Sequence, residues 1–319
     1  MHWLAELDGR RVVVEVPATT ANLGAGYDCL GLALGLVDRI AVEVRGWSRG
    51  GVDLAVEGHG ADDLPSDRTN HFVVALEAAL RSAHGQLPDG VGWRIEMQNA
   101  IPLARGLGSS AAATIGGLLA GNSLAGEPLT TADILRLATE LEGHSDNVAA
   151  ALHGGFVVSA STDDGQIEAI RFDAPRDLRA VLFIPERRLS THDMRAALPA
   201  TVPMADAVAN LARVGLGVAG LATGRSDLLR VLTVDRLHEP YRAAVYPELP
   251  RLISAAREAG AIGACLSGSG STVVAFADTV SSITRIEGAF SAAAADLDLD
   301  GHIEVVSPRN VGASVLGGL

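Results

Sequence analysis

The stretch Pro102-Leu-Ala-Arg-Gly-Leu-Gly-Ser-Ser-Ala-Ala112 joins a predicted strand to a predicted helix, and it decides how the rest of the chain is interpreted. Residues 91–98 before it alternate apolar and polar side chains, and residues 111–124 after it are mostly small residues with Leu and Ile. Glycine lets a backbone adopt positive φ and approach an anion closely. Ser109 and Ser110 are favourable N-cap residues, and the free N–H groups of a helix's first turn attract negative charge. The stretch therefore predicts a backbone cradle for phosphate.

A capped helix after a tight turn is the simpler interpretation of this stretch. One Ser and one Gly would be enough for it, whereas residues 106–110 contain two of each. Ser109 or Ser110 can also offer a hydroxyl to Mg²⁺, which prefers one or two protein oxygens together with phosphates and waters. A phosphate cradle with a nearby metal accounts for the whole run.

The composition restricts the class of protein. The chain has 319 residues, of which 48% are hydrophobic, enough for two domains with their own cores. Its net charge of −13 and pI near 5.1 argue against nucleic acid or an anionic membrane as a partner. Two cysteines, Cys29 and Cys265, exclude a disulfide scaffold and favour a reducing, cytoplasmic setting. No stretch is expected to be long enough to cross a bilayer.

The chain has no lysine: all 25 of its Lys and Arg residues are arginine. This absence excludes Schiff-base chemistry, which needs a lysine amine. It also excludes a Walker-type phosphate loop and a protein-kinase site, both of which use a lysine at the phosphates. Any bound nucleotide must therefore be held by backbone N–H groups, arginine and a metal ion.

Strand and helix patterns alternate in both halves, which predicts a two-domain α+β protein. Strands are expected at residues 11–16, 30–36, 40–44, 52–56, 91–98, 155–160, 178–184, 261–266, 271–277 and 302–306. Helices are expected at residues 70–84, 111–124, 131–142, 146–152, 205–221, 250–259 and 281–295. The polar stretch Ser161–Gln166 suggests a division into residues 1–163 and 164–319, although its flanking strands could pair across it.

The segment Pro17–Asp28 is too polar and too rich in glycine for a simple connection, and it is expected to be a long loop. Its Asn22 and Asp28 could bind a small polar substrate. Asx turns that stabilise the loop itself explain the same residues equally well.

Two more segments and a set of arginines carry candidate chemistry. Glu142-Gly-His-Ser-Asp-Asn147 could supply a Mg²⁺ ligand and substrate contacts, or only a helix end and a new N-cap, and its spacing is not that of a zinc site. Leu266-Ser-Gly-Ser-Gly-Ser-Thr272 precedes a Val-rich strand, so it is either a loop over a phosphate or a glycine hairpin rather than a dinucleotide fingerprint. Arginine binds carboxylate and phosphate through a planar fork. The candidates are Arg187, Arg188, Arg195, Arg236 and Arg242.

Three of these segments together resemble the GHMP small-molecule kinases, which are named for galacto-, homoserine, mevalonate and phosphomevalonate kinases. Residues 102–111 are similar to their phosphate-loop signature, residues 17–28 to their N-terminal motif and residues 267–272 to their C-terminal one. Order and spacing agree over nearly the whole chain. The resemblance implies an N-terminal domain with the phosphate loop, a C-terminal ferredoxin-like domain, and a site in the cleft between them.

Within this superfamily, the chain is most similar to the homoserine kinases. The similarity lies in A-N-L-G-A-G-Y-D-C-L-G-L-A-L from residue 21, E-G-H-S-D-N-V-A-A-A-L from 142, R-A-A-L-P from 195 and H-E-P-Y-R from 238. It implies that ATP phosphorylates the side-chain hydroxyl of L-homoserine to O-phospho-L-homoserine, a step toward threonine. It also implies bound Mg²⁺, a cytoplasmic location and a homodimer.

The resemblance also implies roles for individual residues. Asp28 would bind the substrate amino group, Arg195 and Arg242 its carboxylate, and Ser110 and Glu142 the Mg²⁺. The other expected substrate-binding residues are Asn22, His144 and Asn147, and the expected catalytic residues are Ser110, Glu142 and Asn147. The expected ATP-binding residues are Asn70, Pro102, Leu103, Ala104, Arg105, Gly106, Leu107, Gly108, Ser109, Ser110, Ala111 and Ala112.

The chain departs from the family pattern at a few positions. Ala150 and Ser271 stand where proline is usual, and Asn147 stands where some relatives have an aspartate near the attacking hydroxyl. An amide cannot act as a base, so the proton is expected to leave to the γ-phosphate or to water. The alternatives are a GHMP kinase for threonine, mevalonate or shikimate, and a non-catalytic binding protein of this fold.

Overall fold

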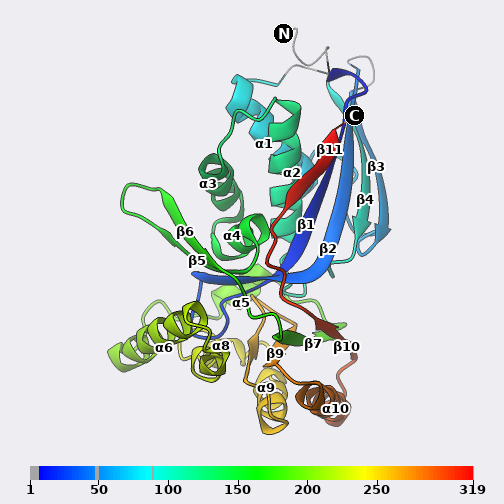
Figure 1. The fold of residues 1–319 in the computed structure, drawn as a ribbon. Coiled ribbons are helices and arrows are strands. Elements are labelled where there is room, and N and C mark those ends of the chain that lie inside the picture. The colour runs from blue at the N-terminus through cyan, green and yellow to red at the C-terminus, as the bar shows by residue number, and fades with distance from the viewer. Residues whose placement is uncertain (1–6, 47–49, 88–89, 319) are drawn as a thin grey trace.

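The computed structural model describes residues 7–46, 50–87 and 90–318, which form two sheets with helices packed against them (Figure 1). The strands are β1 (Arg11–Ala21), β2 (Leu30–Arg45), β3 (Gly51–Gly58), β4 (Gly92–Asn99), β5 (Phe156–Ser161), β6 (Ile167–Phe172), β7 (Arg179–Pro185), β8 (Gly263–Leu266), β9 (Val273–Ala277), β10 (Gly301–Val306) and β11 (Ser314–Gly318). The helices are α1 (His71–His84), α2 (Ser109–Leu124), α3 (Thr131–Glu142), α4 (Asp146–His153), α5 (Thr191–Ala196), α6 (Met204–Ala222), α7 (Leu229–Leu232), α8 (Glu239–Arg242), α9 (Leu249–Glu258) and α10 (Val280–Asp296).

The larger sheet has the strand order β11-β1-β2-β4-β3, and β5 and β6 extend it from the start of β2. Alternation along β4 buries Trp93, Ile95 and Met97 on the face that packs against the helices. Helices α1 and α2 lie along this face, as Figure 1 shows. Because α2 packs on this sheet, its first residues and the phosphate loop before them are held at one end of the helix layer.

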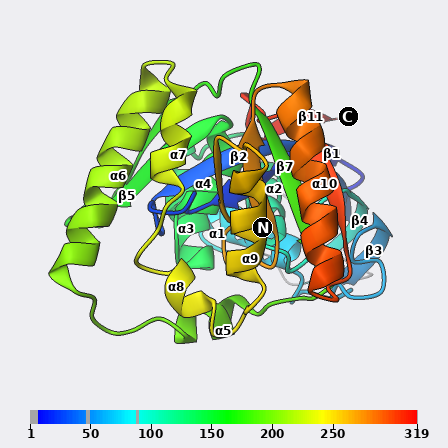
Figure 2. The same ribbon diagram turned by 90° about the horizontal axis from the view of Figure 1, so that it is seen from below.

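The smaller sheet is antiparallel, with the order β10-β7-β9-β8. Its strands and main helices follow the order β7, α9, β8, β9, α10, β10, which is the β-α-β-β-α-β arrangement of a ferredoxin-like domain. Helices α9 and α10 pack side by side on one face of this sheet, and they lie in front of it in the view of Figure 2. In the core between β7 and α10, the rings of Phe183 and Phe290 have their centroids 5.9 Å apart. The expected ferredoxin-like C-terminal domain is confirmed.

The first strand is longer than expected. It continues through Pro17 to Ala21, so the loop begins only at Asn22. Proline is tolerated here because the pairing register with β2 shifts between Pro17 and Ala18, where the ladder is interrupted. The expected strands 30–36 and 40–44 are likewise one continuous strand, β2.

The two sheets do not divide at residue 163. β5 and β6 pair across the turn between them, so the polar stretch Ser161–Gln166 is a hairpin within the larger sheet. The chain changes sheets after β6, and β11 then returns from the C-terminal end to pair with β1. Local polarity identified the turn, but pairing between strands distant in sequence decides which sheet each strand joins.

Helix α6 has an unusually exposed apolar face. Its 19 residues have a mean hydropathy of 1.2, so by length and composition it is the one helix in the described part of the chain that could cross a membrane. This corrects the expectation that no stretch is long enough. Polar residues tie the helix to its own domain, because Asp206 pairs with Arg236 and buried Asn210 binds Asp235.

Gly117 allows α1 and α2 to pack closely, which yields a stability prediction. A Cβ at Gly117 would overlap the Phe72 carbonyl oxygen and lie 2.8 Å from the Ala75 Cβ, whereas a Cβ at Gly288 in α10 meets nothing within 4 Å. We expect Gly117→Ala to lower the free energy of unfolding by about 1–3 kcal/mol, the usual cost of overpacking. Gly288→Ala should instead raise it by about 0.5–1 kcal/mol. Denaturant unfolding of both variants checks this, and equal effects would contradict it.

Candidate active site

The phosphate loop connects β4 to α2 through two glycines with positive φ. Gly106 and Gly108 have φ values of 73° and 72°. A Cβ at Gly108 would overlap the Thr19 hydroxyl, and one at Gly106 would overlap the carbonyl oxygen of Ser267, so neither position accepts a side chain without movement.

The start of α2 differs from expectation. Gly108, not a serine, occupies the N-cap position, and no side chain caps the helix. The first-turn N–H groups of a helix have no partner within the helix. These groups are therefore left for a ligand, and they offer the positive end of the helix dipole to an anion.

The loop lines a cavity of about 260 Å³ between the two domains. The cavity brings together most of the residues that the sequence singled out. It is lined by Asn22, Asp28, Ala104, Gly106, Leu107, Gly108, Ser109, Ser110, Ala111, Glu142, His144, Asp146, Asn147, Thr191, Arg195, Arg242, Gly268 and Ser269.

Four residues of the predicted ATP-binding run, Pro102, Leu103, Arg105 and Ala112, do not line this cavity, and Leu103 lines a neighbouring one instead. The guanidinium of Arg105 is buried and donates to the carbonyl oxygens of Leu103, Pro185 and Glu186, so it fastens the loop to the smaller domain. Pro102 lies beside it, lining a small separate cavity, and the side chain of Ala112 is fully buried in the core. The side chains of Pro102, Arg105 and Ala112 therefore support the loop from the side away from this cavity.

A second cavity of about 200 Å³ adjoins the first through Ser109 and Ser110, which line both. Its walls are mainly apolar, with Ile40, Leu64, Pro65, Met97, Leu103 and Ala113. Asn70 also lines it, but its amide caps α1: Oδ1 accepts from the Phe72 N–H at 3.0 Å, and Nδ2 donates to the Pro65 carbonyl at 3.0 Å. The position is suited to the flat apolar part of a ligand whose polar end lies at the phosphate loop.

Ser110 and Glu142 meet at the start of α2. The Ser110 hydroxyl donates to Glu142 Oε1 at 2.7 Å, and the Thr114 hydroxyl donates to the same oxygen at 2.7 Å. One hydroxyl and one carboxylate beside free backbone N–H groups are the hard oxygen donors that Mg²⁺ takes together with phosphates. In residues 7–46, 50–87 and 90–318 no cluster of three or more His, Cys, Asp or Glu residues could hold a metal alone.

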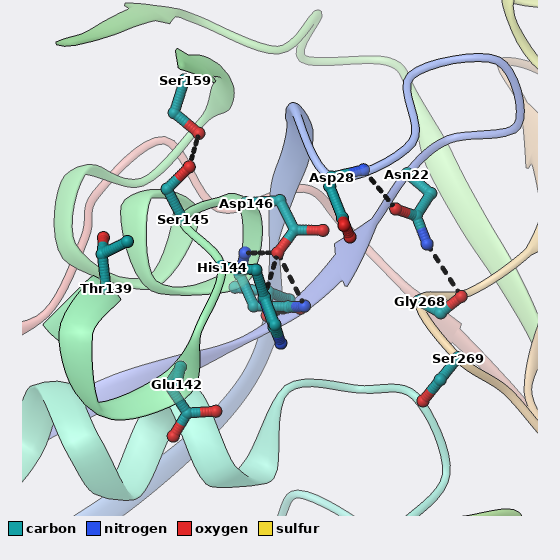
Figure 3. Close-up of polar contacts among 12 residues, drawn as sticks. Asn22, Asp28, Thr139, Glu142, His144, Ser145, Asp146, Ser159, Gly268 and Ser269 are labelled. Carbon is teal, nitrogen blue, oxygen red and sulfur yellow. Dashed lines mark hydrogen bonds and ion pairs between the residues drawn. The ribbon is translucent and has the colours of Figure 1, made fainter. Parts of the chain in front are cut away.

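The loop at Asn22–Asp28 folds onto itself and onto the smaller domain. Asn22 Oδ1 accepts from the Asp28 N–H at 2.9 Å, and Asn22 Nδ2 donates to the Gly268 carbonyl at 2.9 Å, as Figure 3 shows. Asn22 and Asp28 both have positive φ, at 68° and 56°. Asn22 therefore stabilises the loop itself, but through a contact six residues along the chain rather than an Asx turn, which spans two. The carboxylate of Asp28 lines the cavity.

Asp146 orders the residues at the start of α4. Its buried Oδ1 lies 2.7 Å from His144 Nδ1 (Figure 3). The same oxygen accepts from the Asn147 N–H at 2.7 Å. This hydrogen bond raises the pKa of His144, against the effect of burial. Asn147 Oδ1 accepts from the Thr19 hydroxyl at 2.8 Å, which fixes the orientation of its amide.

The two predicted carboxylate-binding arginines are held in different ways. Arg195 forms a two-pronged ion pair with Asp28, with N–O distances of 2.8 and 2.9 Å, and it also donates to the Tyr27 hydroxyl. Arg242 is almost fully buried, and its Nε and Nη1 donate to the carbonyls of Met194 and Gly268. These contacts leave Nη2 of Arg242 for a ligand in the cavity.

Two contacts at the site were not predicted from the sequence. Thr191 lines the cavity with its hydroxyl 3.0 Å from that of Ser269, which belongs to the quoted segment 266–272, and Thr19 orients Asn147 from within β1. Thr19 belongs to the quoted segment 17–28, so its polar position was the available signal. Nothing local marks Thr191, which reaches the site through the packing of the two domains.

Comparison with known proteins gives the family. The profile of the GHMP kinases N terminal domain matches residues 70–155, and that of the GHMP kinases C terminal domain matches residues 218–296. The homoserine kinase of Moorella thermoacetica is 42% identical over 304 residues, which are 95% of this chain and 99% of that protein. The homoserine kinase of Microchaete diplosiphon is 40% identical over 96% of this chain and 97% of its own.

Solved structures agree with the sequence comparison. The crystal structure of homoserine kinase from Cytophaga hutchinsonii matches with a TM-score of 0.84 and 30% identity, covering 96% of this chain and 97% of that one. Mevalonate kinase from L. major matches with a TM-score of 0.67 at 16% identity, which shows a shared fold. The near full-length similarity at about 40% identity shows that the chain belongs to the homoserine kinase family of the GHMP kinases.

Proposed function

We propose that the protein transfers the γ-phosphoryl group of ATP to the side-chain hydroxyl of L-homoserine, giving O-phospho-L-homoserine and ADP. One observation carries the proposal: a single cavity is lined by the phosphate loop, by the Ser110–Glu142 pair, and by Asp28 with two arginines. A phosphate, a metal ion and both charged groups of an amino acid can therefore be met in one place. The names of the relatives support the same substrate.

Two adjacent features would hold the nucleotide. The uncapped start of α2 would bind the β- and γ-phosphates through backbone N–H groups, and the apolar second cavity would take the base. Mg²⁺, when bound by Ser110, Glu142 and the phosphates, would neutralise the charge that develops during transfer. With no lysine in the chain, these groups carry the role that a phosphate-loop lysine has elsewhere.

The substrate side presents alternating charges. An α-amino acid carries its ammonium and its carboxylate on the same carbon, so a site that binds it needs a carboxylate and a guanidinium close together. The Asp28–Arg195 pair supplies both, and Arg242 adds Nη2 from the buried side. This arrangement favours an amino acid over mevalonate or shikimate, which have no ammonium group.

Asn147 would position rather than deprotonate the attacking hydroxyl. An amide cannot take a proton near neutral pH, and its oxygen already accepts from Thr19. Phosphoryl transfer depends mainly on in-line positioning and charge stabilisation, so a strong base is not required. The hydroxyl proton would leave to the transferred phosphoryl group or to water.

We also propose the cytoplasmic homodimer expected from the resemblance. The support in the structure is the face of α6 that exposes Met204, Val208, Leu211 and Leu216. Exposed apolar side chains grouped along one helix can form a surface that another protein covers.

The function is tested by measuring ADP release with homoserine, threonine, mevalonate and shikimate, each with Mg²⁺ and ATP. We expect the highest kcat/KM with homoserine, and phosphorus NMR should show a phosphate ester on the side-chain oxygen. Mevalonate and shikimate should be poor substrates because they leave Asp28 unpaired with an ammonium. A higher kcat/KM for either of them would contradict the proposed substrate, and no ADP release with any of the four would favour a binding protein.

The metal assignment predicts the effect of Glu142→Gln. The amide keeps the shape of the side chain and removes the charge that would neutralise Mg²⁺. We expect the Mg²⁺ concentration for half-maximal rate to rise by about 10- to 100-fold, with part of the kcat recovered at high Mg²⁺. Glu140→Gln, on an exposed residue of the same helix, is the control. An unchanged Mg²⁺ requirement in Glu142→Gln would remove Glu142 from the metal site.

A further inference from the structure

His238 is fully buried behind the wall of the substrate cavity. It immediately precedes α8, and its side chain has 0% exposure. Its Nε2 lies 2.8 Å from the carbonyl oxygen of Gly24, and its Nδ1 lies 3.1 Å from Nη1 of Arg242. One ring therefore touches both the loop that carries Asp28 and the arginine that faces the cavity.

These two contacts fix the tautomer of His238. A guanidinium nitrogen can only donate, so Nδ1 must be the acceptor, and a carbonyl oxygen can only accept, so Nε2 must carry the hydrogen. Burial lowers the pKa of His238 to about 4 and outweighs the opposite effect of the Asp235 carboxylate, 3.7 Å from Nε2, while the positive charge of Arg242 acts with burial. A protonated ring would place an N–H against the guanidinium, so the neutral ring is the form that satisfies both contacts.

The loop on one side of His238 has little freedom to move independently. A Cβ at Gly24 would lie 2.5 Å from the backbone carbonyl carbon of Thr233, so the loop packs directly on the segment before α8. The Tyr27 ring of the same loop lies 5.2 Å from the His238 ring and 5.4 Å from the Arg242 guanidinium carbon. A cation close to an aromatic face is attracted to it, which adds a second contact between the loop and Arg242.

The guanidinium on the other side is held at three points. Nε donates to the Met194 carbonyl, Nη1 donates to the Gly268 carbonyl at 3.0 Å, and the same Nη1 donates to His238. A planar guanidinium fixed at Nε and Nη1 has no rotation left, so the direction of Nη2 is set by these partners.

We propose that His238 is a positioning residue that fixes the distance between the Asp28 loop and Arg242, and thereby matches the site to the spacing of an ammonium and a carboxylate on one carbon. The proposal rests on the proposed function, because it assigns those two groups to homoserine. His238 does not line the cavity, so it would act through Arg242 and the Asp28 loop rather than through a contact of its own with the substrate. Its effect is on the binding of the amino-acid end and not on the nucleotide.

Two substitutions separate the two contacts. Glutamine can place its amide nitrogen near the position of Nε2, so His238→Gln keeps a donor for Gly24 and loses the acceptor for Arg242. Asparagine can place its amide oxygen near the position of Nδ1, so His238→Asn keeps the acceptor for Arg242 and loses the contact with Gly24. A hydrogen bond to a charged group is worth about a tenfold or larger change in affinity.

The experiment measures kcat and KM for homoserine and for aminopropanol, which is homoserine without its carboxylate. We expect His238→Gln to raise KM for homoserine about tenfold, with a much smaller change for aminopropanol and none in KM for ATP. His238→Asn loosens the Asp28 end, which both compounds use, so it should raise both KM values by a similar factor. Leu252→Ala, in the core of the smaller domain, controls for loss of stability alone.

The outcomes distinguish this inference from the proposed function. If the kcat/KM of the wild-type protein is not higher for homoserine than for mevalonate and shikimate, the proposed function is wrong. If wild-type protein prefers homoserine but His238→Gln affects both compounds equally, or behaves as Leu252→Ala does, His238 does not position Arg242. If His238→Gln does not fold, His238→Asn decides: a loss on homoserine alone, or unchanged KM values, would overturn the proposal.

Discussion

The site depends on the contact between the loop Ser267–Gly270 of the smaller domain and two loops of the larger one. The buried Ser267 hydroxyl lies 2.6 Å from the Gly106 carbonyl oxygen and 2.9 Å from the Thr20 hydroxyl. The Gly268 carbonyl accepts from both Asn22 and Arg242. Buried polar groups of this kind must be hydrogen-bonded, because an unpaired one costs about 1–3 kcal/mol. The phosphate loop, the Asp28 loop and Arg242 are therefore held in place through the same few backbone groups.

The arginines show how a chain without lysine divides its cationic roles. Arg105 is used entirely within the protein and joins the phosphate loop to the end of β7. Arg195 is paired with Asp28 at the cavity, and Arg242 is fixed from behind with one nitrogen left over. The planar guanidinium of arginine has fixed donor directions, so it can join a loop to a neighbouring strand and can also orient a ligand. The ammonium of lysine, on a flexible stem, sets no such direction.

Much of the fold and of the candidate site could be predicted from the sequence, because the decisive signals are local. Glycines and serines at residues 106–110 marked the phosphate loop, and helical spacing marked α3 at the residues where it lies. Long-range pairing could not be predicted: β11 joins β1, and β6 joins the larger sheet, only in the folded chain. The direction of a side chain was equally hidden, since Arg105 lies within the phosphate-loop signature and still faces away from the cavity.

Substitution of Ser267 by alanine tests most directly whether this contact holds the site together. Ser267→Ala removes the hydroxyl between the two domains, while Ser282→Ala removes a comparable buried and hydrogen-bonded hydroxyl within α10. Steady-state kinetics of both variants should show KM values for homoserine and for ATP raised together, by several-fold to about tenfold, in Ser267→Ala only. If Ser267→Ala lowers the melting temperature as Ser282→Ala does and leaves both KM values unchanged, the loop does not organise the site.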